Sequence, residues 1–432
     1  MKKNFINMMV VGFALFSMLF GAGNVIFPPY LGLGCGSQWV RGFLYYFLAD
    51  IGLALCCLFA IARRGGHEEI IGHLGKIPAK ILTTVIILCI GPMVGIPRAA
   101  ASTFEMSVMP LLPQVSNVVF SACFFLLIAV LCMKESAVVD IIGKMLTPML
   151  LVGLLVLIIK GVVTPLGPVP DKVQVSNVPV TGINAGYQTM DVLAVVIFGI
   201  LISRSIRQKG YENPSQQNRM ILGAGLVAGF SLMVIYLGLT YLGVTASDHF
   251  SLRVEYTFLV TSIVHMLLGQ AGTVIFAIVV FLACVTTAVA LVSSCSDYFS
   301  GLTGGRIPYT VMVPVICISS GIVTTFGLNR IISIAGPILD VVYPPTLFLI
   351  VLSFLDKWIH NEGVFRLGAL GAFSVSLLSV TGYGAPFQEL LRLLPFYRYG
   401  FGWIVPALAF ALLGGLIPTR KQHLPDPAVS KI

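Results

Sequence analysis

The sequence predicts an all-α membrane protein that crosses the bilayer about twelve times. Hydrophobic residues make up 57% of its 432 residues and charged residues only 10%, whereas charged residues make up about 25% of a typical soluble protein. So little charge cannot cover the water-facing surface of a chain of this length. Apolar runs of roughly 20 residues, the length needed to cross a bilayer as a helix, also recur along the chain.

The expected spans lie near 5–33, 39–62, 79–110, 116–133, 138–161, 187–205, 219–243, 270–300, 307–328, 331–355, 364–381 and 399–418. A further apolar segment, 256–268, is too short to span comfortably and is expected to form a re-entrant or surface helix. No linker or low-complexity tract divides the chain, so we expect one membrane domain over 1–432. Its polar C-terminal tail, 419–432, is expected to be disordered.

Lysines and arginines gather in loops that would face one side of the membrane if the spans alternate. These loops are 62–76, 133–136, 203–219, 356–366 and 419–423. The positive-inside rule places this side, and both chain termini, in the cytoplasm. The formal charge of +9 therefore indicates membrane orientation and not nucleic-acid binding. The nine cysteines are scattered without metal-ligand spacing and are expected to be packing residues.

The first expected span contains a Gly-Ala-Gly-Asn run, 21–24, followed by Pro28 and Pro29. Glycine lowers helix stability by about 1 kcal/mol relative to alanine, and an interior proline by about 3 kcal/mol. Unpaired backbone groups at membrane depth are tolerated only where they are buried in protein or line a cavity. This span alone leaves two interpretations open: a break that exposes backbone ligands, or tight helix packing through small residues with the prolines ending the span.

The sixth expected span contains Gly199 near its middle. Paired interruptions in corresponding halves of a transporter point to a binding site at the membrane midplane. The first span would run outward, so the helix after Asn24 would present a positive N-terminus suited to a carboxylate. The sixth would run inward, and its outer half would end near Phe198 with carbonyls suited to an ammonium group. A zwitterionic amino acid would satisfy both ends.

The eighth expected span carries two adjacent hydroxyls, Thr286 and Thr287. Hydroxyl and carbonyl oxygens without a carboxylate suit Na⁺. The alternative interpretation is that the threonines hydrogen-bond to carbonyls in their own helix, as is common in spans.

Five segments together resemble the bacterial branched-chain amino acid:cation symporter family, LIVCS. They are 12–33, 91–105, 186–202, 281–299 and 332–345. The resemblance implies a LeuT-type architecture with two inverted five-helix repeats, 5–161 and 187–355, and peripheral helices over 364–418. It also implies a secondary active symporter of the bacterial cytoplasmic membrane. Such a carrier imports leucine, isoleucine and valine with Na⁺ by alternating access.

Together with the two interruptions, the resemblance implies a set of site residues. The candidate substrate residues are Gly21, Ala22, Gly23, Asn24, Phe198 and Gly199. The candidate Na⁺ ligands are the carbonyls of Ser17 and Phe20 and the eighth-span pattern of Ala283, Thr286 and Thr287. The expected partners are the amino acid, Na⁺ as coupling ion and membrane lipid. No other cofactor, no obligate protein partner and no nucleic acid are expected.

Several charges fall inside the expected spans: Asp50, Arg98, Glu105 and Asp340. Intramembrane charges are functional candidates, although a structural ion pair explains each of them equally well. Asp191 opens the sixth span and is expected to be a cap or an outer-gate residue. Asp50, Glu105 or Asp340 would carry a proton if Na⁺ is not the coupling ion. The alternative function is therefore a proton-coupled carrier of other apolar amino acids such as methionine.

A membrane enzyme is the competing class. It would need clustered catalytic groups, and the one candidate cluster is His67, Glu68, Glu69 and His73. The spacing is not that of an HExxH metal site, and the segment fits an amphipathic loop better. We therefore expect no enzymatic activity.

Overall fold

The computed structural model describes residues 2–64, 67–133, 147–211, 213–381, 389 and 391–417. Within these ranges the chain is built from helices and contains no strand, which confirms the all-α prediction. Residues 138–146 of the fifth expected span and the tail 419–432 lie outside the described ranges.

The N-terminal half places helices on the first five expected spans. They are α1 (Lys2–Leu19), α2 (Ala22–Cys35), α3 (Trp39–Phe47), α4 (Leu53–Arg64), α5 (His67–Gly72), α6 (Lys76–Leu88), α7 (Gly95–Thr103), α8 (Asn117–Met133) and α10 (Thr147–Val163). Short helical segments, η1 (Gly36–Gln38), η2 (Leu48–Gly52), η3 (Cys89–Met93) and η4 (Phe104–Val108), join or extend them. Of these, η2, η3 and η4 are single π-helical turns, a feature often found at functional sites.

The second half continues in the same way. Its helices are α11 (Val178–Thr189), α12 (Asp191–Gln208), α13 (Pro214–Thr245), α14 (Tyr256–Leu302), α15 (Tyr309–Thr324), α16 (Leu328–Leu355), α17 (Glu362–Thr381) and α19 (Ile404–Leu416), with the short η6 (Tyr397–Tyr399). The apolar segment 256–268 is helical and joins the eighth span within α14 across a kink at Gly269, where φ is 64°. Among the residues that the structure describes, six helical stretches are long and apolar enough to cross a membrane, and five shorter apolar helices accompany them.

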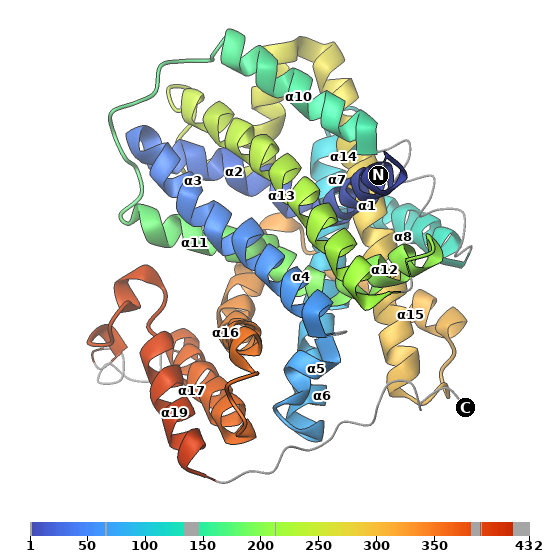
Figure 1. Ribbon diagram of the computed structural model, residues 1–432. Coiled ribbons are helices and arrows are strands. Elements are labelled where there is room, and N and C mark those ends of the chain that lie inside the picture. The colour runs from blue at the N-terminus through green and yellow to red at the C-terminus, as the bar shows by residue number, and fades with distance from the viewer. Residues whose placement is uncertain are drawn as a thin grey trace.

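The helices are not arranged in chain order (Figure 1). The two last helices, α17 and α19, pack against each other at the edge of the molecule, and α16 lies beside them. The longest helices of the second half cross the first span: α13 packs on α1 and α2, and α14 contacts both. The first span is therefore enclosed by the second half of the chain.

Glycine allows α2 and α13 to approach at backbone distance. A Cβ atom at Gly32 would lie 2.0 Å from the Thr240 carbonyl oxygen, and one at Gly243 would lie 1.9 Å from the Pro29 carbonyl oxygen. Small residues permit such close crossings between membrane helices. The crossing fixes the position of α2 and therefore of the backbone at its N-terminus.

Candidate functional site

The first span is broken where the Gly-Ala-Gly-Asn run begins. Helix α1 ends at Leu19 and α2 begins at Ala22, which leaves Phe20 and Gly21 outside regular helix. Gly21 is extended, with φ −108° and ψ −168°, and its N–H donates to Asn24 Oδ1 at 3.3 Å. The predicted break is confirmed. The first N–H groups of α2 have no partner within the helix, so they are available at this point.

The proline pair does not end the span. Pro28 and Pro29 both lie inside α2, although the interpretation based on tight packing placed the end of the span there.

The second break is at Met190 and not at Phe198 and Gly199. Helix α11 ends at Thr189, α12 begins at Asp191, and Met190 between them is left-handed with φ 68°. Residues 195–200 are continuous helix within α12, so the predicted position of this break is wrong. Gly199 instead packs against α4, where a Cβ atom would lie 3.1 Å from Ile61 Cγ2.

An arginine occupies the carbonyls at the end of α11. Arg98 of α7 is buried and donates to the carbonyls of Gln188 and Thr189, the latter at 3.0 Å. These are the last carbonyls of α11, the half of the sixth span before the break, and they bind the guanidinium here, so the expected binding of an ammonium group by helix carbonyls stays a prediction. The guanidinium lies 5.7 Å from the centre of the Phe27 ring, and a Cβ atom at Gly23 would lie 3.0 Å from its Nη2. Arg98 thus lies between the two breaks.

Side chains from both breaks also meet directly. Asn24 Nδ2 donates to Asp191 Oδ2 at 2.9 Å and also hydrogen-bonds to the Tyr236 hydroxyl. Asp191 is 3% exposed and begins α12, the half of the sixth span after the break. The cap of this helix is Met190 and not Asp191, and the outer-gate role stays a prediction. The Asn24–Asp191 bond joins α2 to α12.

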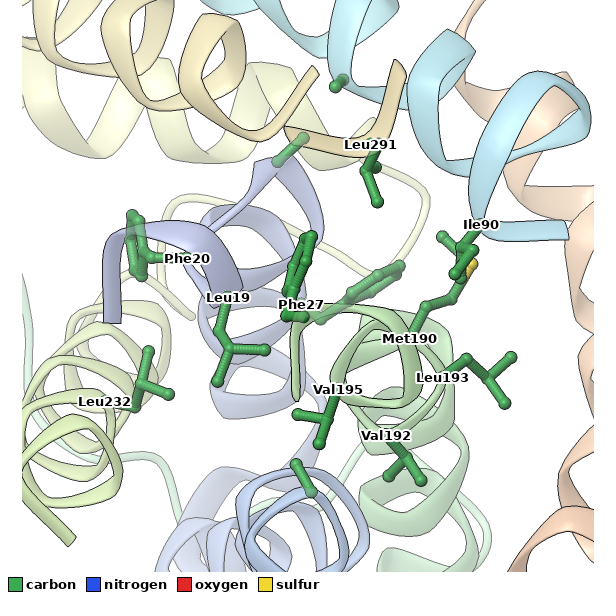
Figure 2. Packing of buried hydrophobic residues seen from close by; sticks show 14 of the residues in the cluster. Leu19, Phe20, Phe27, Ile90, Met190, Val192, Leu193, Val195, Leu232 and Leu291 are labelled. Carbon is green, nitrogen blue, oxygen red and sulfur yellow. The ribbon is translucent and has the colours of Figure 1, made fainter. Parts of the chain in front are cut away.

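A cavity of about 40 Å³ lies between the breaks, large enough for about one or two water molecules. Its polar lining comes from Asn24, Arg98, Thr189, Asp191 and Thr287, and its apolar lining includes Met18, Leu19, Ile90, Ala194, Phe198 and Leu291. Figure 2 shows several of these apolar side chains around Met190. Of the predicted substrate residues, Gly21, Ala22, Asn24 and Phe198 line the cavity. Gly23 contacts Arg98 instead, and Gly199 packs away from the cavity.

The predicted cation ligands lie beside the first break. Thr287 lines the cavity, and its hydroxyl is buried without a hydrogen-bond partner among the described residues. A Cβ atom at Gly21 would lie 3.7 Å from this hydroxyl. Thr286 instead donates to the Ala283 carbonyl at 2.7 Å, which is the back-bonding alternative. Ser17 and Phe20 are buried at the end of α1.

The remaining intramembrane acids lie elsewhere. Glu105 accepts from the Thr257 hydroxyl at 2.8 Å and from the Leu328 N–H at 3.1 Å, so it ties together the starts of α14 and α16. Asp340 lines a separate cavity of about 720 Å³ with Tyr187 and Arg392. Asp50, in η2, is fully buried and accepts from the Thr189 hydroxyl at 2.8 Å. Asp50 is therefore the one that reaches the second break.

Sequence reasoning noted Arg98 and Asp191 as charged residues but did not place them in the site. Their intramembrane charge was the available signal.

A family model described as branched-chain amino acid transport protein matches residues 4–421. The chain belongs to this family. It is 32% identical to the branched-chain amino acid permease BraB of Bacillus subtilis over 418 residues, which cover 94% of each chain. It is also 32% identical to a putative branched-chain amino acid carrier protein of Staphylococcus aureus, over 95% of this chain and 96% of that protein.

Several solved transporter structures share the fold of this chain. A nucleobase-cation-symport-1 family transporter in a closed conformation matches with a TM-score of 0.62 at 13% identity, over 94% of this chain and 91% of that chain. A Na⁺-coupled sialic acid symporter matches with a TM-score of 0.62 at 14% identity, over 96% and 91%. MhsT in complex with L-phenylalanine matches with a TM-score of 0.58 at 16% identity, over 94% and 98%.

These likenesses confirm the LeuT-type fold. The chain is a multi-pass membrane transporter and not an enzyme. The boundaries of the two repeats stay a prediction.

Proposed function

We propose that this chain is a secondary active symporter that imports leucine, isoleucine and valine with Na⁺ by alternating access. We place it in the bacterial cytoplasmic membrane with both termini in the cytoplasm. The names of its relatives support the substrate class. The observation that carries the proposal is the small cavity between the two breaks, because its lining contains groups of opposite charge, Arg98 and Asp191.

A zwitterion fits these charges in one orientation. Its carboxylate would bind at the N-terminus of α2, where N–H groups are available beside Gly21 and Ala22 and the helix dipole favours an anion. Arg98 lines the same cavity and adds a positive charge. The ammonium group would pair with the carboxylate of Asp191, which takes the place of the helix carbonyls that Arg98 occupies.

The side chain of the amino acid would lie against the apolar lining, which includes Phe198 and Leu291. One methylene group in such a pocket changes the binding free energy by about 1–3 kcal/mol. Discrimination among the three branched-chain substrates should therefore be modest. The cavity of about 40 Å³ is too small for any of them, so the surrounding helices must separate for the substrate to enter. This requirement is consistent with alternating access.

The Na⁺ ion would bind beside the first break. Its proposed ligands are the carbonyls of Ser17, Phe20 and Ala283 and the hydroxyls of Thr286 and Thr287. The Thr287 hydroxyl supports this assignment because it is buried, faces Gly21 and has no partner among the described residues. A buried hydroxyl without a partner is costly, and a bound cation would satisfy it.

Uptake by the purified full chain in proteoliposomes tests the proposal. Labelled leucine should accumulate when an inward Na⁺ gradient is imposed, and isoleucine and valine should compete with it. Protein-free liposomes and liposomes with equal Na⁺ on both sides are the controls. If leucine accumulates under a proton gradient in the absence of Na⁺, the coupling ion is H⁺ and not Na⁺. Leucine that only equilibrates under every gradient would reject active transport.

A further inference from the structure

Two buried carboxyl groups, Asp50 of η2 and Asp191 of α12, are neighbours. They are 0% and 3% exposed, and Thr189, which precedes Met190 and Asp191 in the chain, donates a hydrogen bond to Asp50 at 2.8 Å. Two neighbouring carboxylates that are both buried in protein cannot both remain ionised, because their repulsion adds to the cost of removing them from bulk water. The pair therefore holds a proton.

The charges around the pair lead to the same conclusion. Among the described residues, Arg98 is the cation whose charge acts on both carboxyl groups. The other titratable groups that face the pair are the hydroxyls of Tyr46 on α3, Tyr236 on α13 and Tyr343 on α16. One arginine balances one carboxylate, so the other carboxyl group is neutral.

The contacts indicate which of the two is the anion. Asp191 lies in the first turn of α12, where the helix dipole favours negative charge. It accepts a hydrogen bond from Asn24 and lines the cavity. Asp50 accepts one hydrogen bond on Oδ1, from Thr189, while its Oδ2 is buried without a partner among the described residues. An ionised Oδ2 would be left unsatisfied, whereas a protonated Oδ2 would be a donor beside Asp191.

We propose that Asp50 is a proton-binding site that carries its proton on Oδ2 and donates it to the carboxylate of Asp191. Asp50 is not among the described residues that line the cavity. It is a positioning residue, which acts by holding Asp191 as the anion that receives the ammonium group of the substrate. This consequence for binding rests on the proposed function, whereas the protonation of Asp50 does not.

Tyr46 offers a competing explanation. Its hydroxyl is also buried without a partner among the described residues and lies close to Asp50. A small shift would let it donate to an ionised Asp50, which would then need no proton. The variant Tyr46→Phe separates the two explanations, because it removes this donor and leaves the ring in place.

Infrared spectroscopy of the purified full chain at neutral pH tests the proton directly. A protonated carboxyl group has a C=O stretching band that a carboxylate lacks. We expect a band that disappears in Asp50→Asn and persists in Tyr46→Phe. Glu105→Gln is the control, because it alters a half-buried acid in another part of the expected spans and should leave the Asp50 band in place. A carboxylic-acid region that is identical in wild type and Asp50→Asn would overturn the proposal.

Leucine binding to the same variants tests the positioning role. Asp50→Leu removes the proposed donor to Asp191 and should weaken leucine binding about tenfold or more. Asp50→Asn keeps an N–H donor for Asp191 and an oxygen acceptor for Thr189, so it should restore most of that loss. Asp191→Asn removes the anion and should also weaken binding about tenfold or more. Equal weakening by Asp50→Leu and Asp50→Asn, or unchanged binding in Asp50→Leu, would overturn the role of Asp50. If the Asp50 band is present but the wild type does not bind leucine, the proposed function fails and the proton assignment is supported.

Discussion

The two adjacent threonines of α14 give the sharpest test of the cation site, because the structure predicts different effects for them. The Thr287 hydroxyl is buried beside Gly21 without a partner among the described residues, whereas Thr286 donates to the Ala283 carbonyl at 2.7 Å. We expect Thr287→Ala to raise the Na⁺ concentration needed for leucine uptake. We expect the shift for Thr286→Ala to be smaller, because its oxygen is already bound within the helix.

The magnitude follows from the loss of one oxygen ligand. Hydrogen bonds and similar polar contacts to a charged group contribute about 1.5–3 kcal/mol, so the Na⁺ requirement should rise about 10- to 100-fold. The same substitution breaks no hydrogen bond of the described residues, because the Thr287 hydroxyl makes none. It also removes a buried methyl group that faces Gly21, so the unfolding temperature measured without Na⁺ should fall by only a few degrees.

The assay is initial leucine uptake into proteoliposomes over a series of Na⁺ concentrations, with unfolding measured on the same preparations. Thr287→Ser is the matched control, because it keeps the hydroxyl and should keep the Na⁺ requirement near that of the wild type. An unchanged requirement in Thr287→Ala would refute the assignment of Thr287 as a ligand. The assignment would also be refuted if Thr286→Ala raised the Na⁺ requirement more than Thr287→Ala does.

Three further substitutions test the neighbouring geometry. Gly23→Ala would place a Cβ atom 3.0 Å from Arg98 Nη2, and overpacking of about 1–3 kcal/mol should weaken leucine binding, measured by competition with labelled leucine. Arg98→Lys keeps the charge but cannot donate from two nitrogens to α11, so leucine binding should weaken by about 1.5–3 kcal/mol; binding equal to the wild type would contradict this role. Gly243→Ala would place a Cβ atom 1.9 Å from the Pro29 carbonyl and should lower the unfolding temperature by several degrees; because this crossing fixes the N-terminus of α2, it should also weaken leucine binding, and a variant with unchanged stability and binding would contradict this role.

The membrane class and the first break could be predicted from sequence because both depend on local chemistry. Low charge and apolar runs of spanning length leave few alternatives to a polytopic membrane protein. The run at 21–24 combines small residues with an amide that can cap a helix, and the structure shows Asn24 in that role. These are properties of short segments, so they are visible without knowing what packs against them.

The second break could not be predicted in this way. Methionine is not a residue that usually adopts the left-handed conformation, which favours glycine and asparagine. Met190 adopts it because contacts from distant segments hold the two helices on either side. Arg98 binds the last carbonyls of α11, and Asn24 binds Asp191 at the start of α12. Gly199 was the residue that suggested a helix break in the sequence, but in the structure its small size allows close packing against Ile61.

The same contacts indicate how substrate binding could be linked to movement. Arg98 connects α7 to α11, the half of the sixth span before the break, whereas Asn24 and Asp191 connect α2 to α12, the half after it. A zwitterion held by Arg98 and Asp191 together would therefore bridge groups fixed to different halves of a broken helix. Because the cavity of about 40 Å³ is too small for such a ligand, its entry would separate these groups, and its binding would then hold them at a new spacing. The polar groups proposed to recognise the substrate are those that join the two halves, so under this proposal binding and rearrangement of the helices are linked.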